Sequence, residues 1–433
     1  MFIALRRIVF HIRYKKGDLM KSQRPSLPTR LFQGGRKGIT IIGVLLVLLV
    51  AGLTIGAFAL AHPGKSASAN TVLNTYVSAG DGTLYKLTGN SGTASWHVQV
   101  TDRNLPAPPA VANGTVYLST LSGSAYALDA ATGQTKWSVK LDGNIISSPV
   151  VVNNVVYVGS DNNYIYALNA STGSTIWRFD AGVGNETVVT RSVAVANGIV
   201  YGSSSDLTDH SYLFAINASS GQQVWRVKVY DQLFTDVQVV NGVVYFASSA
   251  ITKEGGPRTT DSYVYAYDAS SGKRLWISGK IGNLILSAPT IANGVVYVGS
   301  EDTYVYALNA STGARLWRHQ FGGPIYASPI VVNGTVYAGI ASNPSTTAPT
   351  TTSDATTTSG SIAALNASTG NLIWQQPVNN YTGTSLAYAN SLIYFGTNAN
   401  AVYALNAASG QQAWSFQMSS AVPFDNAPVS VGP

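Results

Sequence analysis

Residues Ala307–Trp317 read Ala-Leu-Asn-Ala-Ser-Thr-Gly-Ala-Arg-Leu-Trp, and versions of this stretch recur eight times along the chain. The 433-residue chain contains eight tryptophans, and each of them closes one copy. Glycine lies four residues before every Trp, Ser or Thr lies five before it, and Asp or Asn lies eight before it in seven copies. The tryptophans are Trp96, Trp137, Trp177, Trp225, Trp276, Trp317, Trp374 and Trp414. A module of about 40 residues with fixed turn chemistry is typical of four-stranded propeller blades.

Each repeat also contains short runs rich in β-branched and aromatic residues. In the third repeat these runs span 148–152, 155–159, 164–168 and 175–179. Asn-Gly pairs such as Asn293-Gly294 separate the first two runs in five repeats, and they supply the positive φ angles that a two-residue hairpin needs. The pattern predicts four antiparallel strands per repeat, joined as a meander.

The first repeat lacks a run for its first strand. Residues 427–432, Ala-Pro-Val-Ser-Val-Gly, match the pattern of the first-strand run in the other repeats. We therefore expect residues 425–433 to complete blade one, which closes the ring and leaves no free sheet edge at the junction. The sequence predicts an all-β, eight-bladed β-propeller over residues 71–433.

The repeated Ala-x-Asp/Asn-x-x-Thr-Gly-x-x-x-Trp pattern resembles the tryptophan-docking motif of the quinoprotein (PQQ-like repeat) eight-bladed β-propeller family. The resemblance covers about residues 71–433 and recurs in all eight repeats. It implies the propeller fold, with the eight tryptophans as structural docking residues between blades. The family includes quinone-dependent dehydrogenases, outer-membrane assembly lipoproteins and other binding proteins, so the fold alone does not select a function.

An apolar segment precedes the repeats. Residues 38–61 are 24 uncharged residues, and a helix of that length, at ~1.5 Å per residue, exceeds the ~30 Å hydrocarbon core of a bilayer. Arg36 and Lys37 abut its start, so the positive-inside bias places residues 1–37, a basic tail, in the cytoplasm and the propeller outside. The sequence predicts a single-pass protein of the cell membrane, with a transmembrane signal anchor over 38–61 and a linker over 62–70.

Two alternatives at the N-terminus stay open. A cleaved signal peptide would use small-residue sites such as Ala59–Ala61 or Ala67–Ala69. The length of both the basic leader and the apolar run favours the anchor. Met20 opens a shorter leader than Met1, so either methionine can be the start.

Charge and cysteine content exclude several classes of protein. The formal charge of +7 comes from residues 1–61, which hold ten Lys and Arg against one Asp, whereas residues 62–433 hold 16 Lys and Arg against 18 Asp and Glu. A nucleic-acid-binding domain would carry the positive charge itself, so we expect no nucleic-acid partner. The chain contains no cysteine, which rules out disulfides, thiolate metal ligands, a cysteine nucleophile and a lipid-bearing cysteine.

A quinone cofactor is the main alternative that the resemblance raises. All eight tryptophans occupy one repeat position, where packing between blades uses them, and none is left to stack on a quinone. The dehydrogenases of the family also place a disulfide of adjacent cysteines against the quinone. No HExxH, GxSxG or GxxxxGK(S/T) motif occurs. We therefore expect no cofactor, no metal site and no catalytic residue.

The long connections all lie on one predicted face of the propeller. The excess length in the fourth, fifth and seventh repeats falls between the second and third strands, at residues 203–211, 248–262 and 341–360. In a four-stranded meander these connections emerge on the same face as those between blades, here called the decorated face. Loops on a rigid scaffold are where binding residues usually lie. The candidate binding residues on this face are Arg191, Asp209, His210, Asp236, Lys253 and Arg258. For Arg191 and Asp236, a structural ion pair across neighbouring blades is the alternative.

These observations lead to three functional hypotheses. The favoured one is a membrane-anchored, extracytoplasmic bacterial propeller that binds or scaffolds a protein or cell-envelope ligand without catalysis. The second is a PQQ-dependent oxidoreductase, which the resemblance to the dehydrogenases suggests. The third is an envelope-assembly factor similar to the lipoprotein members of the family, although this chain lacks their lipid-bearing cysteine.

Overall fold

The structure is a computed structural model. It describes residues 73–100, 105, 107–182, 189–190, 192–205, 211–229, 232–233, 235–249, 261–342, 359–381, 383–418 and 429–432. All of these belong to one compact unit, Phe58–Pro433. The predicted basic tail, transmembrane segment and linker lie outside the described residues. Within the described ranges, no helix has the length and apolar character needed to cross a membrane.

The described chain is built from strands, grouped here by blade. Blade one contains β1 (Asn74–Ser78), β2 (Thr83–Thr88), β3 (Ala94–Gln99) and β33 (Val429–Gly432). Blade two contains β4 (Ala110–Ala112), β5 (Thr115–Ser119), β6 (Ser124–Asp129) and β7 (Thr135–Lys140). Blade three contains β8 (Val150–Val152), β9 (Val155–Gly159), β10 (Tyr164–Asn169) and β11 (Thr175–Asp180). Blade four contains β12 (Val189–Thr190), β13 (Ala194–Ala196), β14 (Ile199–Ser205), β15 (Ser211–Asn217) and β16 (Gln223–Val229).

The remaining blades follow the same pattern. Blade five contains β17 (Gln238–Val240), β18 (Val243–Ser249), β19 (Ser262–Asp268) and β20 (Arg274–Ile277). Blade six contains β21 (Thr290–Ala292), β22 (Val295–Gly299), β23 (Tyr304–Asn309) and β24 (Arg315–Gln320). Blade seven contains β25 (Ile330–Val332), β26 (Thr335–Ile340), β27 (Ser359–Asn366) and β28 (Leu372–Asn379). Blade eight contains β29 (Ala387–Ala389), β30 (Leu392–Thr397), β31 (Ala401–Asn406) and β32 (Gln412–Gln417).

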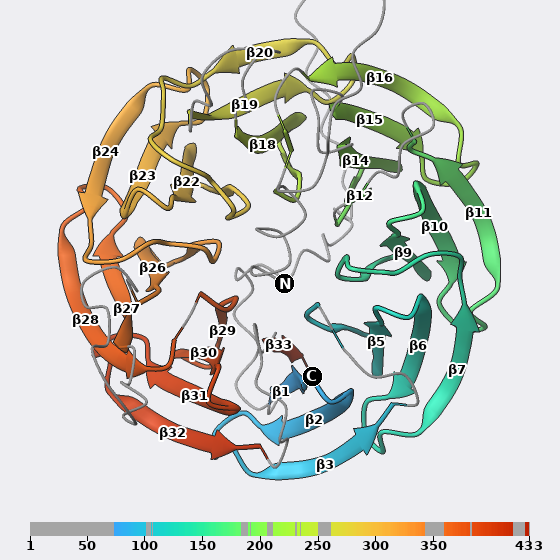
Figure 1. Cartoon of the computed structure of the whole chain (residues 1–433), viewed down its shortest axis with the longest axis horizontal. Helices are drawn as coiled ribbons and strands as arrows, with labels where there is room; N and C mark the ends of the chain where they lie inside the picture. The colour runs from blue at the N-terminus through green and yellow to red at the C-terminus, as the bar shows by residue number, and fades with distance from the viewer. Residues whose placement is uncertain are drawn as a thin grey trace, which may run out of the picture. The chain divides into compact units, whose positions relative to one another are not determined.

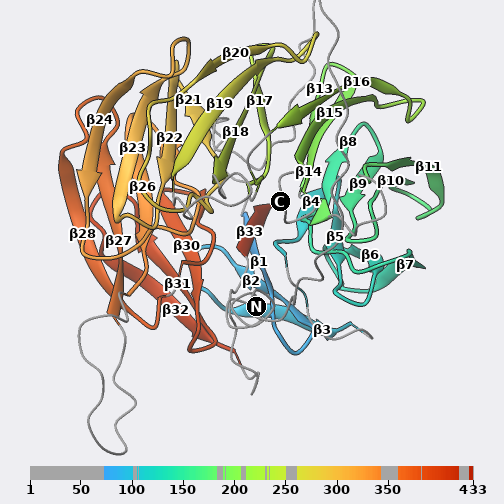
Figure 2. The same cartoon turned by 45° about the horizontal axis from the view of Figure 1, so that its top comes forward.

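The eight antiparallel sheets are arranged in a ring (Figure 1). In blades two to eight the first strand of the meander lies innermost and the last strand forms the outer edge. In the tilted view of Figure 2, β24, β23 and β22 follow one another from the edge inward. In blade four, β12 and β13 both pair with β14. The all-β, eight-bladed propeller predicted from the sequence is confirmed.

Blade one is completed by the C-terminus of the chain. Strand β33 pairs with β1 in an antiparallel register, with Asn74 opposite Gly432 and Val77 opposite Val429. This strand occupies the position that the pattern of residues 427–432 predicts. Since β1 is paired on both sides, neither of its edges is left open at the junction between the first and last blades.

The turns take the conformations that their residues favour. In the hairpin between β25 and β26, Asn333 has φ 48° and Gly334 has φ 76°. Asparagine tolerates the left-handed region and glycine adopts it without steric cost, so the pair forms a tight two-residue hairpin. In the turn before β24, Asn309 Oδ1 accepts hydrogen bonds from the backbone N–H groups of Ser311 and Thr312 at 2.9 and 3.1 Å.

Each tryptophan packs on the following blade. The Trp276 indole lies against Gly313 in blade six, where an added Cβ would come within 2.5 Å of Trp276 Cε3. Trp276 Nε1 also donates a hydrogen bond to the carbonyl oxygen of Ala310 at 2.9 Å. Glycine is needed at position 313 both for this close approach and for its φ of +72°.

The tryptophan contacts form a closed series around the ring. The indole N–H groups of successive blades donate to the carbonyl oxygens of Ala130, Ala170, Ala218, Ala269, Ala310, Ala367, Ala407 and Gly89. The last bond runs from Trp414 in blade eight to Gly89 in blade one, at 3.0 Å. The core is accordingly divided into eight clusters of buried apolar residues, and most of them span one blade boundary.

Candidate binding grooves between the blades

Of the six candidate binding residues named from the sequence, the structure describes Asp236. Asp236 Oδ1 accepts a hydrogen bond from the backbone N–H of Ser192 at 3.0 Å. Ser192 Oγ accepts one from the backbone N–H of Ser148 at 3.1 Å. The carboxylate of Asp236 therefore takes part in contacts that link blades three, four and five. The other five residues, Arg191, Asp209, His210, Lys253 and Arg258, lie outside the described residues.

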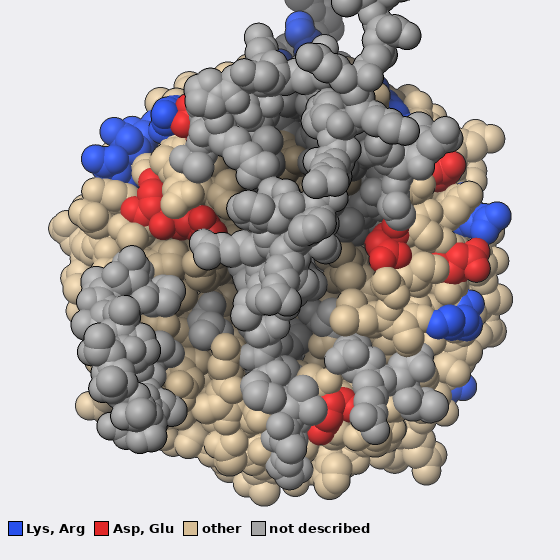
Figure 3. All heavy atoms as spheres, in the orientation of Figure 1, with Lys and Arg blue, Asp and Glu red and all other residues tan. Residues whose placement is uncertain are grey.

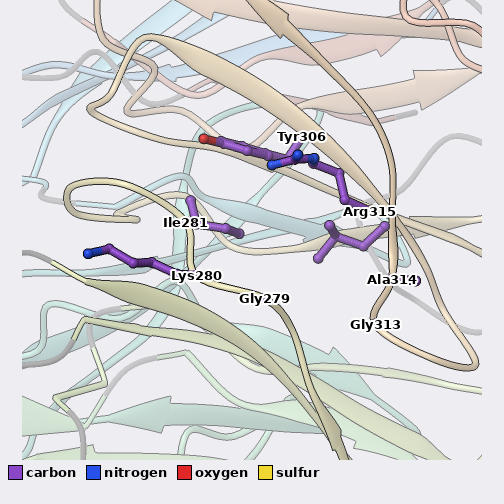
Figure 4. A pocket seen from close by; sticks show the side chains of 8 residues that line it. Gly279, Lys280, Ile281, Tyr306, Gly313, Ala314 and Arg315 are labelled. Atoms are coloured by element: carbon purple, nitrogen blue, oxygen red, sulfur yellow. The ribbon is translucent and has the colours of Figure 1, made fainter.

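The described residues form a groove between blades five and six, here called the five–six groove. Its volume is about 320 Å³. One wall comes from the connection that follows β20, and the other from β23, β24 and the turn between them (Figure 4). The lining residues are Gly279, Lys280, Ile281, Tyr306, Leu308, Gly313, Ala314 and Arg315.

A second groove lies at the corresponding place between blades two and three, here called the two–three groove. Its volume is about 450 Å³. The lining residues are Lys140, Leu141, Asp142, Tyr166, Thr175, Trp177 and Arg178. Sequence reasoning placed the candidate site on the decorated face and did not predict either groove.

An arginine stacked on a tyrosine lies in the same blade face beside each groove, and only Arg178 is itself a lining residue. Arg178 lies opposite Tyr166 in the β10–β11 ladder, and Arg318 lies opposite Tyr306 in the β23–β24 ladder. The guanidinium carbon of Arg178 is 4.6 Å from the ring centroid of Tyr164. Arg318 lies 4.5 Å from the ring centroid of the equivalent tyrosine, Tyr304. These are cation–π contacts on the sheet face that looks toward the preceding blade.

The charge around the two arginines differs. Arg178 forms an ion pair with Asp142 of the preceding blade, with Nη1 3.4 Å from Oδ2. Asp142 directly follows the buried Leu141. The counterpart of Leu141 in blade five is Ile281, and the residue that follows it is Gly282, so this position carries no acid in blade five. The Asp302 carboxylate of blade six lies next to Gly282, since an added Cβ at Gly282 would be 3.0 Å from Asp302 Oδ2. At this boundary the nearby carboxylate therefore comes from blade six itself.

That carboxylate is held by a tyrosine of the same blade. Tyr306 donates its hydroxyl hydrogen to Asp302 Oδ2 at 2.5 Å. Burial of the ring raises the pKa of Tyr306 to about 12, and the hydrogen bond to Asp302 contributes to the same shift. The hydroxyl therefore stays protonated at neutral pH and acts as a donor.

A one-residue bulge shapes the blade-five wall of the five–six groove. In the β19–β20 ladder Tyr265 lies opposite Ile277, and a bridge joins Ser262 to Ile281. Two residues of β19 therefore oppose three residues of the other chain segment, which carries one extra residue as in a β-bulge. Lys280 lies on the wall, as its counterpart Lys140 does in the two–three groove, and its Nζ is 2.5 Å from Asp261 Oδ1. That hydrogen bond raises the pKa of Lys280.

The bulge has a small signal in the sequence. The distance from Trp276 to the next hairpin asparagine, Asn293, is 17 residues, whereas it is 16 residues from Trp137 to Asn153. The extra residue alone gives no indication of a groove.

The described residues can also be tested for their fit to a metal ion or a quinone. Among the residues that the structure describes, no group of three or more His, Asp or Glu side chains is placed to hold a metal ion. All eight indoles donate their N–H to a backbone carbonyl of the next blade. Because packing between blades uses every tryptophan of the chain, the tryptophans do not fit the role of a platform for a stacked quinone.

Comparisons with known proteins place the repeats in a family. The PQQ_2 family model, described as outer membrane protein assembly factor BamB, matches residues 80–208, 164–277, 260–355 and 347–431. The resemblance to PQQ-like repeat propellers stated from the sequence is thereby confirmed.

Two curated relatives match part of the chain. Tetrathionate hydrolase of Acidithiobacillus ferrooxidans is 26% identical over 176 residues, which are 41% of this chain and 27% of that protein. Outer membrane protein assembly factor BamB of Moranella endobia is 26% identical over 138 residues, which are 30% of this chain and 35% of that protein. The matches span only 27% and 35% of the lengths of these relatives.

Solved structures share the fold. BamB from Moraxella catarrhalis superposes with a TM-score of 0.56 at 20% identity, and the match covers 79% of this chain and 91% of that one. Quinohemoprotein alcohol dehydrogenase from Comamonas testosteroni superposes with a TM-score of 0.59 at 15% identity, covering 75% of this chain and 68% of that one. At these identities the likeness establishes the fold alone.

Proposed function

Because the chain belongs to the PQQ_2 family, whose model carries the description outer membrane protein assembly factor BamB, we propose that it is a non-catalytic binding or scaffold module of the cell envelope. The observation that carries this proposal is the use of all eight tryptophans as hydrogen-bonded contacts between blades. The ring is a rigid scaffold, and its surface is available for a protein partner.

The name of the BamB relatives supports a protein partner over a small substrate. The matched region of the Moranella endobia protein is similar to part of this chain, and that protein is named an assembly factor. An assembly role requires contact with other proteins. We therefore propose that the partner of this chain is a protein of the cell envelope.

The proposal includes a membrane anchor at residues 38–61, with the basic tail in the cytoplasm and the propeller outside. Its support is the run of 24 uncharged residues directly after Arg36 and Lys37. Protease added to intact spheroplasts should cleave the propeller and leave the basic tail protected. Cleavage of the tail in intact spheroplasts would contradict this orientation.

Site-specific photo-crosslinking in cells that naturally make the chain tests the binding role. A photoreactive residue is placed at Asp142 near a connection between blades, at Asn333 in a hairpin of the opposite face, or at Leu316 on the outer edge. The side chains of Asp142 and Leu316 are well exposed, so the substitutions leave the core intact. We expect a discrete protein adduct from at least one position and none from the others. Absence of adducts from all three positions would contradict a stable protein partner.

A further inference from the structure

Three blades carry an arginine at the same repeat position, one residue after the tryptophan. These are Arg178, Arg226 and Arg318, in blades three, four and six. In the first two cases the preceding blade supplies an acceptor. Arg178 pairs with Asp142, and Arg226 donates to the carbonyl oxygens of Asp180 and Gly182 at 2.9 and 3.4 Å.

At the boundary between blades five and six the preceding blade supplies a cation instead. Arg318 lies over Tyr304 and near the Tyr306 hydroxyl, both in its own blade. No described residue of blade five forms an ion pair with Arg318 or accepts a hydrogen bond from it. The blade-five wall presents Lys280 and has Gly282 where the blade-two wall has Asp142.

The lining of the five–six groove adds a further cation. Arg315 lies opposite Leu308 in the β23–β24 ladder, on the sheet face that carries Tyr306. Lys280 is paired with Asp261, but Arg315 has no ion-pair partner among the described residues. No acidic side chain lines the groove. Figure 3 shows Lys and Arg side chains at the edge of the ring where blades five and six meet, with Asp and Glu side chains beside them.

The rest of the lining is apolar or without a side chain. Ile281 and Leu308 are almost fully buried beneath the groove, and Ala314 completes its floor. Leu316 follows Arg315 directly and is 52% exposed, but it does not line the groove. A volume of about 320 Å³ lies at the lower end of the range for ligand pockets, which suits the side chains of a peptide.

We propose that the five–six groove binds an acidic, extended segment of the protein partner. A carboxylate of that segment pairs with Arg315, and a neighbouring aliphatic side chain packs against Ile281, Leu308 and Ala314. Charge complementarity selects this occupant. Arg315 has no ion-pair partner among the described residues, whereas the two nearby carboxylates, Asp261 and Asp302, are already bonded to Lys280 and Tyr306. Guanidinium–carboxylate pairs can form two parallel hydrogen bonds. The inference rests on the proposed function, since it assigns the partner-binding surface.

Fluorescence anisotropy with the purified full chain tests the groove. The probe is a fluorescein-labelled short peptide of alternating leucine and glutamate, and the leucine–glutamine peptide is the neutral control. We expect the acidic peptide to bind, the neutral peptide to bind at least about tenfold more weakly, and Arg315→Glu to weaken binding of the acidic peptide by about tenfold or more.

Thr175→Glu is the matched variant, because Thr175 lies opposite Leu168 in blade three as Arg315 lies opposite Leu308 in blade six. It places the same negatively charged residue at the equivalent position and should leave binding unchanged. Both positions are exposed, so both variants should keep the melting temperature of the unmodified chain. Equal affinity of the two peptides, equal loss in the two variants, or no binding of the acidic peptide would each overturn the groove assignment.

Photo-crosslinking separates failure of this inference from failure of the proposed function. The photoreactive residue at Leu316, directly after the groove-lining Arg315, should give the protein adduct, and adding Arg315→Glu should abolish it. Adducts only from the other two positions would reject the groove and leave the binding module standing. The absence of adducts from every position would reject both.

Discussion

At the scale of single residues, most blade boundaries contain one carbonyl that accepts hydrogen bonds from both a tryptophan and a tyrosine. The carbonyl oxygen of Ala310 accepts from Trp276 Nε1 at 2.9 Å and from the Tyr245 hydroxyl at 3.2 Å. The rings of these two donors lie 6.0 Å apart in a tilted arrangement. A carbonyl has two lone pairs, so both bonds can form at once.

The sequence predicts the tryptophan contact of this arrangement but not the tyrosine contact. The tryptophan and the glycine recur at a fixed spacing within one turn, which marks them as structural residues. The tyrosine of the second strand, such as Tyr245, is missed because an aromatic residue there is equally typical of any buried strand. Its hydroxyl partner lies 65 positions away, at Ala310, and only the fold brings the two together.

A double-mutant cycle at this boundary tests the shared acceptor. Tyr245→Phe removes one donor and keeps the ring, so it should cost about 0.5–1.5 kcal/mol of unfolding free energy. Trp276→Phe removes the other donor and also replaces the indole by a smaller ring, so it should cost more. The double variant leaves the Ala310 carbonyl buried without a donor, so its loss should exceed the sum of the single losses. Urea denaturation measures all three. Strict additivity would contradict a shared acceptor.

These tyrosines also predict how stability depends on pH. Burial raises the pKa of both Tyr76 and Tyr394 from 10.0 to about 12. The folded state therefore keeps a proton that the unfolded chain loses above pH ~10, so stability is fully present below that pH and falls as the pH rises from 10 to 12. The melting temperature should drop across this window, while tyrosinate absorbance in the folded protein lags behind that of free tyrosine. A melting temperature that stays constant to pH 12 would contradict these shifts.

At the scale of elements, glycines in different turns serve different purposes. Gly294 and Gly313 have nearly the same φ, +75° and +72°. An added Cβ at Gly294 would meet nothing within 4 Å, whereas at Gly313 it would lie 2.5 Å from the Trp276 indole. The first glycine serves only its hairpin, and the second also makes room for the neighbouring blade.

Matched substitutions separate these two roles. Gly294→Ala should cost about 1–2 kcal/mol, because alanine is strained in the left-handed region. Gly313→Ala should cost about 1–3 kcal/mol more, because the methyl group also displaces the indole. Denaturant unfolding of the two variants gives the difference directly. Equal costs would mean that the tryptophan contact at Gly313 adds nothing to stability.

Hairpins and blades are predictable from the sequence because their turn residues are local signals. The five–six groove is not, because its walls come from two blades and its shape depends on one extra residue. The spacing of 17 residues after Trp276 also occurs after Trp96, so the spacing does not identify a bulge. The opposing pair Arg315 and Leu308 becomes recognisable only once the register of β23 and β24 is known.

At the scale of the whole propeller, stability depends on closing the ring. Strand β33 brings the C-terminus to β1, and Trp414 in blade eight contacts blade one through Gly89. Removal of residues 425–433 should expose one edge of β1 and lower the melting temperature by several degrees. Removal of nine residues at 346–354, in the Thr/Ser/Pro-rich stretch between β26 and β27, should change it little. Equal melting temperatures of the two deletions would contradict closure by β33.

The central claim is that the eight tryptophans hold the ring together and that the propeller binds a partner rather than a quinone. Calorimetric titration of the purified full chain with pyrroloquinoline quinone in the presence of calcium tests it most directly, with dye-linked alcohol oxidation followed in the same samples. We predict no saturable binding and no turnover, because each indole is already packed against the next blade. One-to-one quinone binding accompanied by turnover would contradict the account.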